Sequence, residues 1–158
     1  MMPDTAQQPL WSVRGGSTRG SSHLRSGLPN QDAIGKWSDS SGSRVILVVS
    51  DGHGSARHFR SQIGSQLAVG VATQVLRDAP DPISGQQARS LFQPIVKSWR
   101  EAVYAHLDQN PFTPNEWEVI PAAEREQAQV LITANPNIAY GATLLAVLAT
   151  EADILFLQ

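Results

Sequence analysis

The hydrophobic pattern is strongest at Val45–Val49, where five consecutive residues are valine, isoleucine or leucine. A continuous apolar run of this length predicts a strand that is buried on both faces of a sheet. The run ends abruptly at Ser50-Asp51-Gly52-His53-Gly54-Ser55. A carboxylate therefore follows a buried strand at the edge of the sheet, where loops build sites on a rigid frame. We interpret Asp51 as a candidate metal ligand.

Two stretches precede the hydrophobic run. Trp11-Ser-Val13 alternates apolar and polar residues, as a short half-buried strand would. Gly15–Ser22 is too rich in glycine and serine to be helical, so it forms either a flexible loop or a loop that faces a site.

A further strand is predicted at residues 31–37, where the sequence Ala-Ile-Gly-Lys-Trp is strand-like. The next six residues, Ser-Asp-Ser-Ser-Gly-Ser, have the composition of a turn. This strand and residues 44–50 should therefore form an antiparallel hairpin.

The hairpin brings two carboxylates to one end of the sheet. Counted outward from a turn midpoint near Ser40/Ser41, Asp32 lies eight or nine positions back and Asp51 lies ten or eleven positions forward. Both carboxylates are then close enough to face one cation. The alternative is that Asp32 caps a turn and Asp51 caps the helix that follows.

Helices are predicted between the first and last strands. From Ser55 to about Leu76, apolar residues recur at every fourth position, with small residues on the neighbouring row, as in a helix with one apolar stripe. A second helix is predicted from about Ser84 to Leu107, with a kink or break at Pro94. His106, near the end of this helix, suits the C-terminal end of the helix dipole. Residues 108–120 should form a proline-bearing connection, and a short helix should follow Pro121.

The chain returns to strands near its end. Ala142–Ala149 and Ile154–Gln158 are mostly apolar and are separated by the turn Thr-Glu-Ala-Asp. We interpret both as strands, although the alanine and leucine content of the first would also suit a helix. Strands and helices in this order predict an α+β fold. Because the last strand has no polar exit, we expect the domain to be incomplete at the C-terminus.

Composition narrows the class of protein. A chain of 158 residues is enough for one domain, and we expect a disordered lead-in at residues 1–10 and a single domain at 11–158. There are no cysteines, which excludes disulfides, thiolate zinc sites and cysteine nucleophiles. A net charge of −2 gives no sign of a surface for nucleic acid or an anionic membrane. Without a signal peptide or an apolar membrane span, we expect a soluble, cytoplasmic protein.

Three motifs together resemble the metal-dependent protein phosphatases of the 2C (PPM) type. They are Pro29-Asn-Gln-Asp-Ala33, Val48-Val-Ser-Asp-Gly-His-Gly-Ser55 and Tyr140-Gly-Ala-Thr-Leu-Leu145. The likeness covers residues 11–158 and is nearest to the bacterial branch whose first motif reads Gly-x-Pro-x-Gln-Asp. It implies an antiparallel β-sandwich flanked by helices, acting on phosphoserine and phosphothreonine in proteins.

The resemblance also implies a site with two Mg²⁺ or Mn²⁺ ions. Asp51 would bridge the ions, the Gly52 carbonyl would complete one coordination shell, and Asp32 would hold a metal-bound water or reach a metal. His53 would be the general acid. Two such ions activate a water and neutralise the phosphoryl oxygens.

Two positions differ from the family pattern. Gln31 stands where many members have glutamate, and Gly27 stands where many have a phosphate-binding arginine. Arg25 and His23 lie close by and could bind the substrate phosphate instead. The family also supplies metal aspartates after the last strand seen here. With only Asp51 and Asp32, we expect weak metal binding and little activity from this polypeptide alone.

Two other functions fit parts of the sequence. A non-catalytic phosphatase-like interaction domain is favoured by the residues at positions 27 and 31. A nucleotide-binding unit would use Gly52-His-Gly54 as a phosphate loop, but the third glycine and the Walker lysine are missing.

Overall fold

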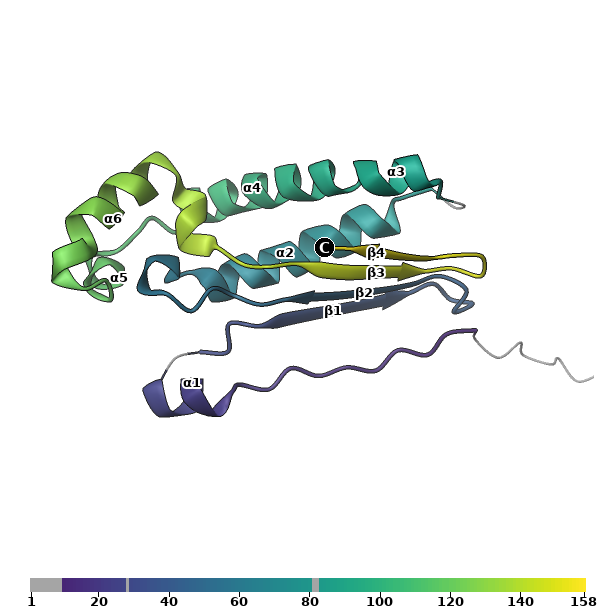
Figure 1. The fold of residues 1–158 in the computed structure, drawn as a ribbon, viewed down its shortest axis with the longest axis horizontal. Coiled ribbons are helices and arrows are strands. Elements are labelled where there is room, and N and C mark those ends of the chain that lie inside the picture. Colours follow the sequence, from purple (N-terminus) through teal and green to yellow (C-terminus); the bar gives the residue numbers. More distant parts are fainter. Residues whose placement is uncertain (1–9, 28, 81–82) are drawn as a thin grey trace, which may run out of the picture.

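The computed structural model describes residues 10–27, 29–80 and 83–158 (Figure 1). The elements in chain order are α1 (Ser21–Ser26), β1 (Ala33–Ser38), β2 (Val45–Ser50), the 3-10 turn η1 (Ala56–His58), α2 (Ser61–Arg77), α3 (Gly85–Ser90), α4 (Phe92–Gln109), α5 (Pro114–Glu118), α6 (Ala122–Ala134), the 3-10 turn η2 (Pro136–Tyr140), β3 (Leu145–Ala149) and β4 (Ile154–Leu157). Of the lead-in predicted at residues 1–10, all but the exposed Leu10 lies outside the described residues.

The strands form one antiparallel sheet in the order β1-β2-β3-β4. The predicted hairpin of β1 and β2 is confirmed, with Ala33 opposite Ser50 and Ser38 opposite Val45. The two predicted C-terminal strands are also present and pair with each other, although β3 begins at Leu145 rather than at residue 142.

The hairpin turn is centred between Ser41 and Gly42, one residue later than the sequence count assumed. The side chain of Asp39 accepts hydrogen bonds from the hydroxyls of Ser41 and Ser43 and from the Arg44 amide. These bonds, with that from Ser41 first, lower the pKa of Asp39 to about 2. Gly42 has a φ of 69°, which other residues rarely adopt.

Helix α2 lies on one face of the sheet and α4 packs on α2, so the fold has three layers (Figure 1). Apolar side chains from all three layers meet in one core. Its buried members are Ile46, Val48, Val69, Ala72, Leu76, Ile95, Ala146 and Leu148. These layers confirm the predicted α+β class.

The opposite face of the sheet also carries apolar side chains, and these are exposed. They are Ile34, Leu47, Val49, Leu145, Ile154 and Phe156. The prediction that β2 is buried on both faces is therefore wrong, because Leu47 is 37% and Val49 is 46% exposed. Among the described residues no helix or second sheet covers this face, so the predicted sandwich stays a prediction.

Helix α2 begins at Ser61, six residues later than predicted. The intervening residues form η1, and the backbone of Arg60 leaves the helical region with φ −111° and ψ 19°. The Arg60 amide donates to the Ala139 carbonyl instead of a helical partner. A tertiary hydrogen bond thus overrides the apolar periodicity at the start of this helix.

The helix predicted at 84–107 is divided in two at Leu91. Ser84 caps α3 through a capping box with Gln87. The break precedes Pro94 by three residues, because proline lacks an amide donor and its ring crowds the residue four positions back. The predicted interruption is confirmed, and it lies before the proline.

The connection predicted at 108–120 contains a further helix, α5, held by a buried ion pair. The Arg60 side chain is 5% exposed and forms a salt bridge with Glu116. It also donates to the hydroxyl of Tyr140 and to the carbonyls of Asn110 and Pro111. These bonds tie α5 to the start of α2 and to η2, around a second apolar core.

His106 has a different role from the predicted contact with the helix dipole. Its Nδ1 is 2.8 Å from the Tyr140 hydroxyl. Burial and then the nearby charge of Arg60 lower the pKa of His106, so its neutral form is favoured. A neutral ring has little attraction for the C-terminal end of a helix.

The segment before β1 differs from the sequence expectation. The strand predicted at Trp11–Val13 does not form; the amide of Trp11 binds the carbonyl of Gly42 without a strand partner. The loop predicted at Gly15–Ser22 ends at Gly20, because α1 begins at Ser21.

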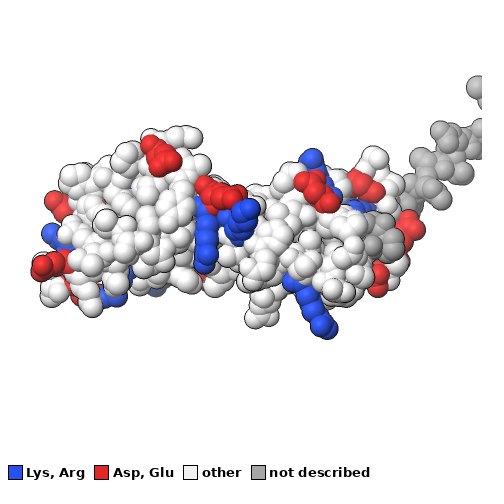
Figure 2. Space-filling model, turned by 90° about the horizontal axis from the view of Figure 1, so that it is seen from above, with Lys and Arg blue, Asp and Glu red and all other residues white. Residues whose placement is uncertain are grey.

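Charged side chains are sparse on the helix side of the molecule (Figure 2). Among the described residues drawn there, blue and red groups are interspersed and form no patch of one sign. No helix in the described part of the chain has the length and hydrophobicity needed to cross a membrane.

Candidate active site

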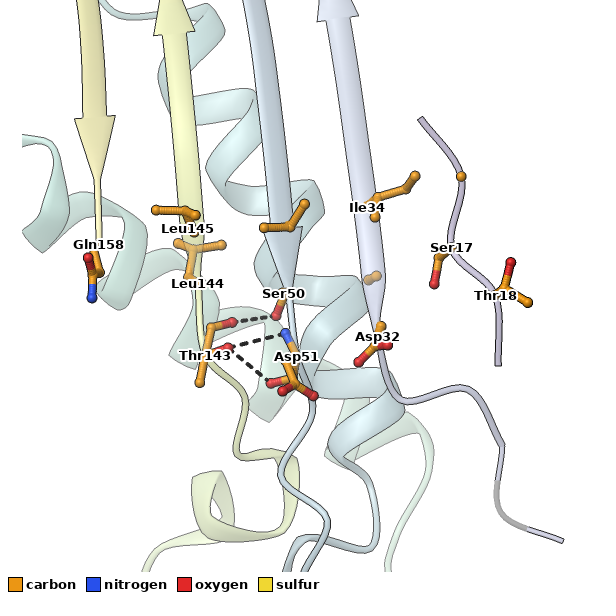
Figure 3. A pocket seen from close by; sticks show the side chains of 13 residues that line it. Ser17, Thr18, Asp32, Ile34, Ser50, Asp51, Thr143, Leu144, Leu145 and Gln158 are labelled. Atoms are coloured by element: carbon orange, nitrogen blue, oxygen red, sulfur yellow. Dashed lines mark hydrogen bonds between the residues drawn. The ribbon is translucent and has the colours of Figure 1, made fainter. Parts of the chain in front are cut away.

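A pocket of about 630 Å³ opens where β1, β2 and β3 meet the loops at one end of the sheet (Figure 3). Residues 16–18 form one wall, the ends of β1 and β2 form the floor, and residues 143–145 and Gln158 form the other wall. The Gly/Ser-rich loop therefore faces a site, which is one of the two interpretations that the sequence allowed.

Asp32 and Asp51 both line this pocket. Ala33 pairs with Ser50. Asp32, which precedes Ala33, and Asp51, which follows Ser50, therefore lie at the same end of the hairpin. Figure 3 shows the two carboxylate side chains beside each other at the foot of β1 and β2. The two carboxylates therefore converge at one end of the hairpin, as the sequence predicts.

The two carboxylates interact electrostatically. Partial burial raises the pKa of Asp32 above its ordinary value. Hydrogen bonding with Asp51 and repulsion from its negative charge raise the pKa of Asp32 further, whereas the charge of His23 lowers it. Two like charges forced together in this way are relieved by a bound cation.

The main chain of Asp51 is bonded to Thr143. The Asp51 amide is 3.2 Å from Thr143 Oγ1, and the Thr143 amide donates to the Asp51 carbonyl at 2.8 Å. The hydroxyl of Ser50 donates to the Thr143 carbonyl. Asp51 directly follows β2, and its main chain is held on one side by Thr143.

Gly52 is buried and has no room for a side chain. A Cβ atom there would lie 2.8 Å from the Gln31 carbonyl oxygen and 3.0 Å from the Cβ of Ser61. Only glycine allows the loop to pass this close to the preceding motif.

Gln31 is 8% exposed, and its surroundings explain why an amide fits there. Its Nε2 donates to the Ser61 hydroxyl at 2.8 Å, and the Ser65 hydroxyl donates to its main-chain carbonyl at 2.6 Å. Its Oε1 is buried and accepts no hydrogen bond within the described part of the chain. A carboxylate in this position would be buried beside Asp32.

We therefore predict that Gln31→Glu destabilises the metal-free protein by about 1–3 kcal/mol. Burial raises the pKa of the new carboxyl in the folded state, so the loss should be larger at pH 7.5 than at pH 4.5. Urea unfolding at the two pH values measures it. Gln66→Glu, on an exposed position of α2, is the matched control and should change stability little. An equal loss at both pH values would contradict the explanation.

His53 is exposed and lies beside His58 rather than among the residues that line the pocket. The two rings meet edge to face, with centroids 4.7 Å apart. The His53 amide donates to the Gly141 carbonyl at 3.0 Å, and His58 Nδ1 donates to the Ile138 carbonyl. A Cβ at Gly141 would lie 2.7 Å from His53 Nδ1, so glycine leaves space for both rings.

The two residues suggested for phosphate binding both lie on α1. His23 is close enough to Asp32 to lower the pKa of that carboxyl. Arg25 is exposed on the same helix. The structure thus brings His23 toward the carboxylate pair. In the described part of the chain, Arg25 shows no contact with that pair.

The donor set at this end of the sheet fits a hard divalent cation. Asp32 and Asp51 offer carboxylate oxygens, which Mg²⁺ and Mn²⁺ prefer. Among the described residues no group of three histidine, cysteine or acidic side chains is placed to hold a metal. Two carboxylates suit an ion that keeps several water ligands.

Four hydroxyl residues that line the pocket were not picked out from the sequence as site residues: Ser17, Thr18, Ser50 and Thr143. The first two lie in a loop whose composition suits either a site or a flexible connection. Thr143 was visible only as part of a motif, because its role depends on a pairing between segments 92 positions apart.

The family model described as Protein phosphatase 2C matches residues 19–158. The match includes every strand of the sheet, both carboxylates and the segment from Tyr140 to Leu145. Searches of curated proteins and of solved structures found no match. Because the family model covers most of the chain, this protein belongs to the protein phosphatase 2C family.

Proposed function

We propose that the domain is a Mg²⁺- or Mn²⁺-dependent protein phosphatase that acts on phosphoserine and phosphothreonine. The observation that carries this proposal is the Asp32–Asp51 pair, which lines a large pocket at the strand ends of a member of the protein phosphatase 2C family. Paired carboxylates at such a place suit metal-assisted hydrolysis of a phosphomonoester.

In this proposal Asp51, Asp32 and the Gly52 carbonyl hold the cations. When bound, the ions supply an activated water and neutralise charge on the phosphoryl oxygens. The wall formed by Ser17 and Thr18 offers hydroxyl donors across the pocket from the carboxylates. His23 binds the substrate phosphate in this proposal, and Arg25 on the same helix is a second candidate for this role.

We assign His53 the role of general acid for the leaving serine or threonine oxygen. Its ring is exposed, and its main chain is anchored to the Gly141 carbonyl. Contact with His58 restricts the orientation of the ring. An exposed, oriented imidazole two residues after Asp51 is suited to donate a proton to the leaving oxygen.

The small number of protein groups that could bind the metal ions leads us to expect low activity. Two carboxylates and one carbonyl are few donors for two ions, so we expect the 158-residue polypeptide to bind Mn²⁺ weakly and to turn over slowly. A cytoplasmic location stays a prediction from the sequence, and we add a role in signalling as part of this proposal.

The test is hydrolysis of p-nitrophenyl phosphate and of a phosphoserine peptide, with Mn²⁺ or with EDTA. We expect slow hydrolysis that requires Mn²⁺ and that Asp51→Asn removes. Hydrolysis that persists in EDTA would contradict the proposed metal mechanism. Rapid Mn²⁺-dependent turnover would support the mechanism and contradict the expected low activity.

A non-catalytic phosphoprotein-binding domain is the second candidate, favoured by Gln31 and Gly27. It predicts that a phosphoserine peptide binds equally well in Mn²⁺ and in EDTA, and that Asp51→Asn does not weaken this binding. A fluorescence-anisotropy titration of the labelled peptide separates the two candidates.

A further inference from the structure

The metal-ligand loop is bordered by a segment that the proposed mechanism does not use. We call residues 138–143 the strap. Gly52 and Ala142 form an isolated antiparallel bridge between the loop and the strap. On either side of this bridge, the His53 amide donates to Gly141 and the Thr143 amide donates to Asp51.

Thr143 bonds to both main-chain groups of Asp51. Its amide and its hydroxyl donate to the Asp51 carbonyl, at 2.8 Å and 3.3 Å, and its hydroxyl oxygen lies 3.2 Å from the Asp51 amide as acceptor. Figure 3 shows Thr143 directly beside Asp51, on the side away from Asp32. Fixing the amide and the carbonyl of one residue restrains its φ and ψ, and hence the direction of its Cα–Cβ bond and the side-chain rotamers open to it.

The bonding pattern also orients Gly52. In an antiparallel pair, a residue that lies between two cross-strand hydrogen bonds directs its own amide and carbonyl to the other side. The bonds made by Asp51 and His53 flank Gly52 in this way. The Gly52 carbonyl therefore points away from the strap.

The strap is itself held rigidly by the start of α2. The Arg60 amide donates to Ala139, and its guanidinium donates to the Tyr140 hydroxyl at 2.6 Å. Tyr140 is fully buried, and its carbonyl is packed against Gly64. Because Thr143 lies on this rigid strap, its hydrogen bonds can keep Asp51 in a fixed geometry better than bonds from a mobile loop could.

We infer that Thr143 is a positioning residue: its hydroxyl holds the Asp51 main chain so that the carboxylate faces the cation beside Asp32. The presence of the cation rests on the proposed function. The restraint of the Asp51 main chain by Thr143 rests on the hydrogen bonds described above. A purely structural role for Thr143 predicts instead that its loss affects stability alone.

The test uses three variants of the full chain. Thr143→Val removes the hydroxyl and keeps the shape, Thr143→Ser keeps the hydroxyl, and Ser50→Ala removes the other side-chain bond to the strap. Denaturant unfolding shows which variants are folded. Thr143→Ala replaces the valine variant if the latter does not fold.

The first readout needs no metal. Amide hydrogen exchange at Asp51 should accelerate about tenfold in Thr143→Val, because one hydrogen bond of the amide is lost, and should stay at the wild-type rate in Thr143→Ser and Ser50→Ala. Unchanged exchange in the valine variant would overturn the positioning role, whether or not the protein binds metal.

The second readout is Mn²⁺ affinity by calorimetric titration. Thr143→Val removes a hydroxyl that hydrogen-bonds to the metal ligand Asp51, so it should weaken Mn²⁺ binding about tenfold. The other two variants should bind Mn²⁺ with near wild-type affinity. Equal affinity in all variants would overturn the inference. No Mn²⁺ binding by the wild-type protein would instead refute the proposed function and with it the cation part of the inference, and exchange at Asp51 would still decide whether Thr143 fixes the main chain.

Discussion

Asp51→Asn should abolish detectable binding of Mn²⁺ and leave the fold intact. Asparagine keeps the size and the main-chain bonds to Thr143 but removes the charge that a hard cation requires. Stability should not fall, because repulsion between this group and Asp32 raises the pKa of Asp32 in the folded protein. Removing that repulsion favours folding at neutral pH, where both groups are ionised in the unfolded chain.

Calorimetric titration with Mn²⁺ and urea unfolding, done on the same preparation, measure the two effects. Asp39→Asn is a control of equal charge change at the far end of the hairpin, and it should leave Mn²⁺ binding unchanged. Wild-type affinity in Asp51→Asn would place the cation elsewhere.

Gly64→Ala should severely destabilise the fold. A Cβ atom on Gly64 would lie 1.7 Å from the carbonyl oxygen of Tyr140 and 2.7 Å from its carbonyl carbon. Both atoms belong to the main chain, so no side-chain rotation relieves the clash. To make space, α2 and the strap must separate, which breaks the bond between Arg60 and the Tyr140 hydroxyl.

We expect this substitution to cost about 4 kcal/mol or more, enough to unfold a marginally stable domain. Gly70→Ala is the matched control on the same helix, because nothing lies within 4 Å of its Cβ position. That variant should gain about 0.5–1 kcal/mol from the lower entropy of the unfolded chain. Thermal unfolding by circular dichroism compares the two. Similar melting temperatures for them would mean that α2 does not contact the strap as described.

The sequence predicts the hairpin and its carboxylates well because both depend on local signals. A buried apolar run, a serine-rich turn and the parity of strand positions are enough to bring Asp32 and Asp51 to one end of the sheet. The exact centre of the turn was missed, since it depends on side-chain bonds to Asp39.

Features that depend on distant contacts were missed. The late start of α2 follows from bonds between Arg60 and residues 139 and 140, and α5 forms where the sequence suggested an irregular connection. The exposed face of β2 was also missed, because an apolar run does not reveal which neighbours cover it.

The same limit applies to the site. Its carboxylates follow from the strand pattern, but the position of Thr143 beside Asp51 requires the β2–β3 register. His53 was assigned by resemblance, and its contact with His58 follows from the space that Gly141 provides.

The central claim is that Asp32 and Asp51 together bind a divalent cation. The most direct measurement is a Mn²⁺ titration followed by ¹H–¹⁵N NMR, because the paramagnetic ion broadens the signals of the amides nearest to it. Broadening should begin at Asp32, Asp51, Gly52 and Thr143, and it should be absent from these positions in Asp51→Asn. Broadening that begins elsewhere, or that is the same in the variant, would contradict the claim.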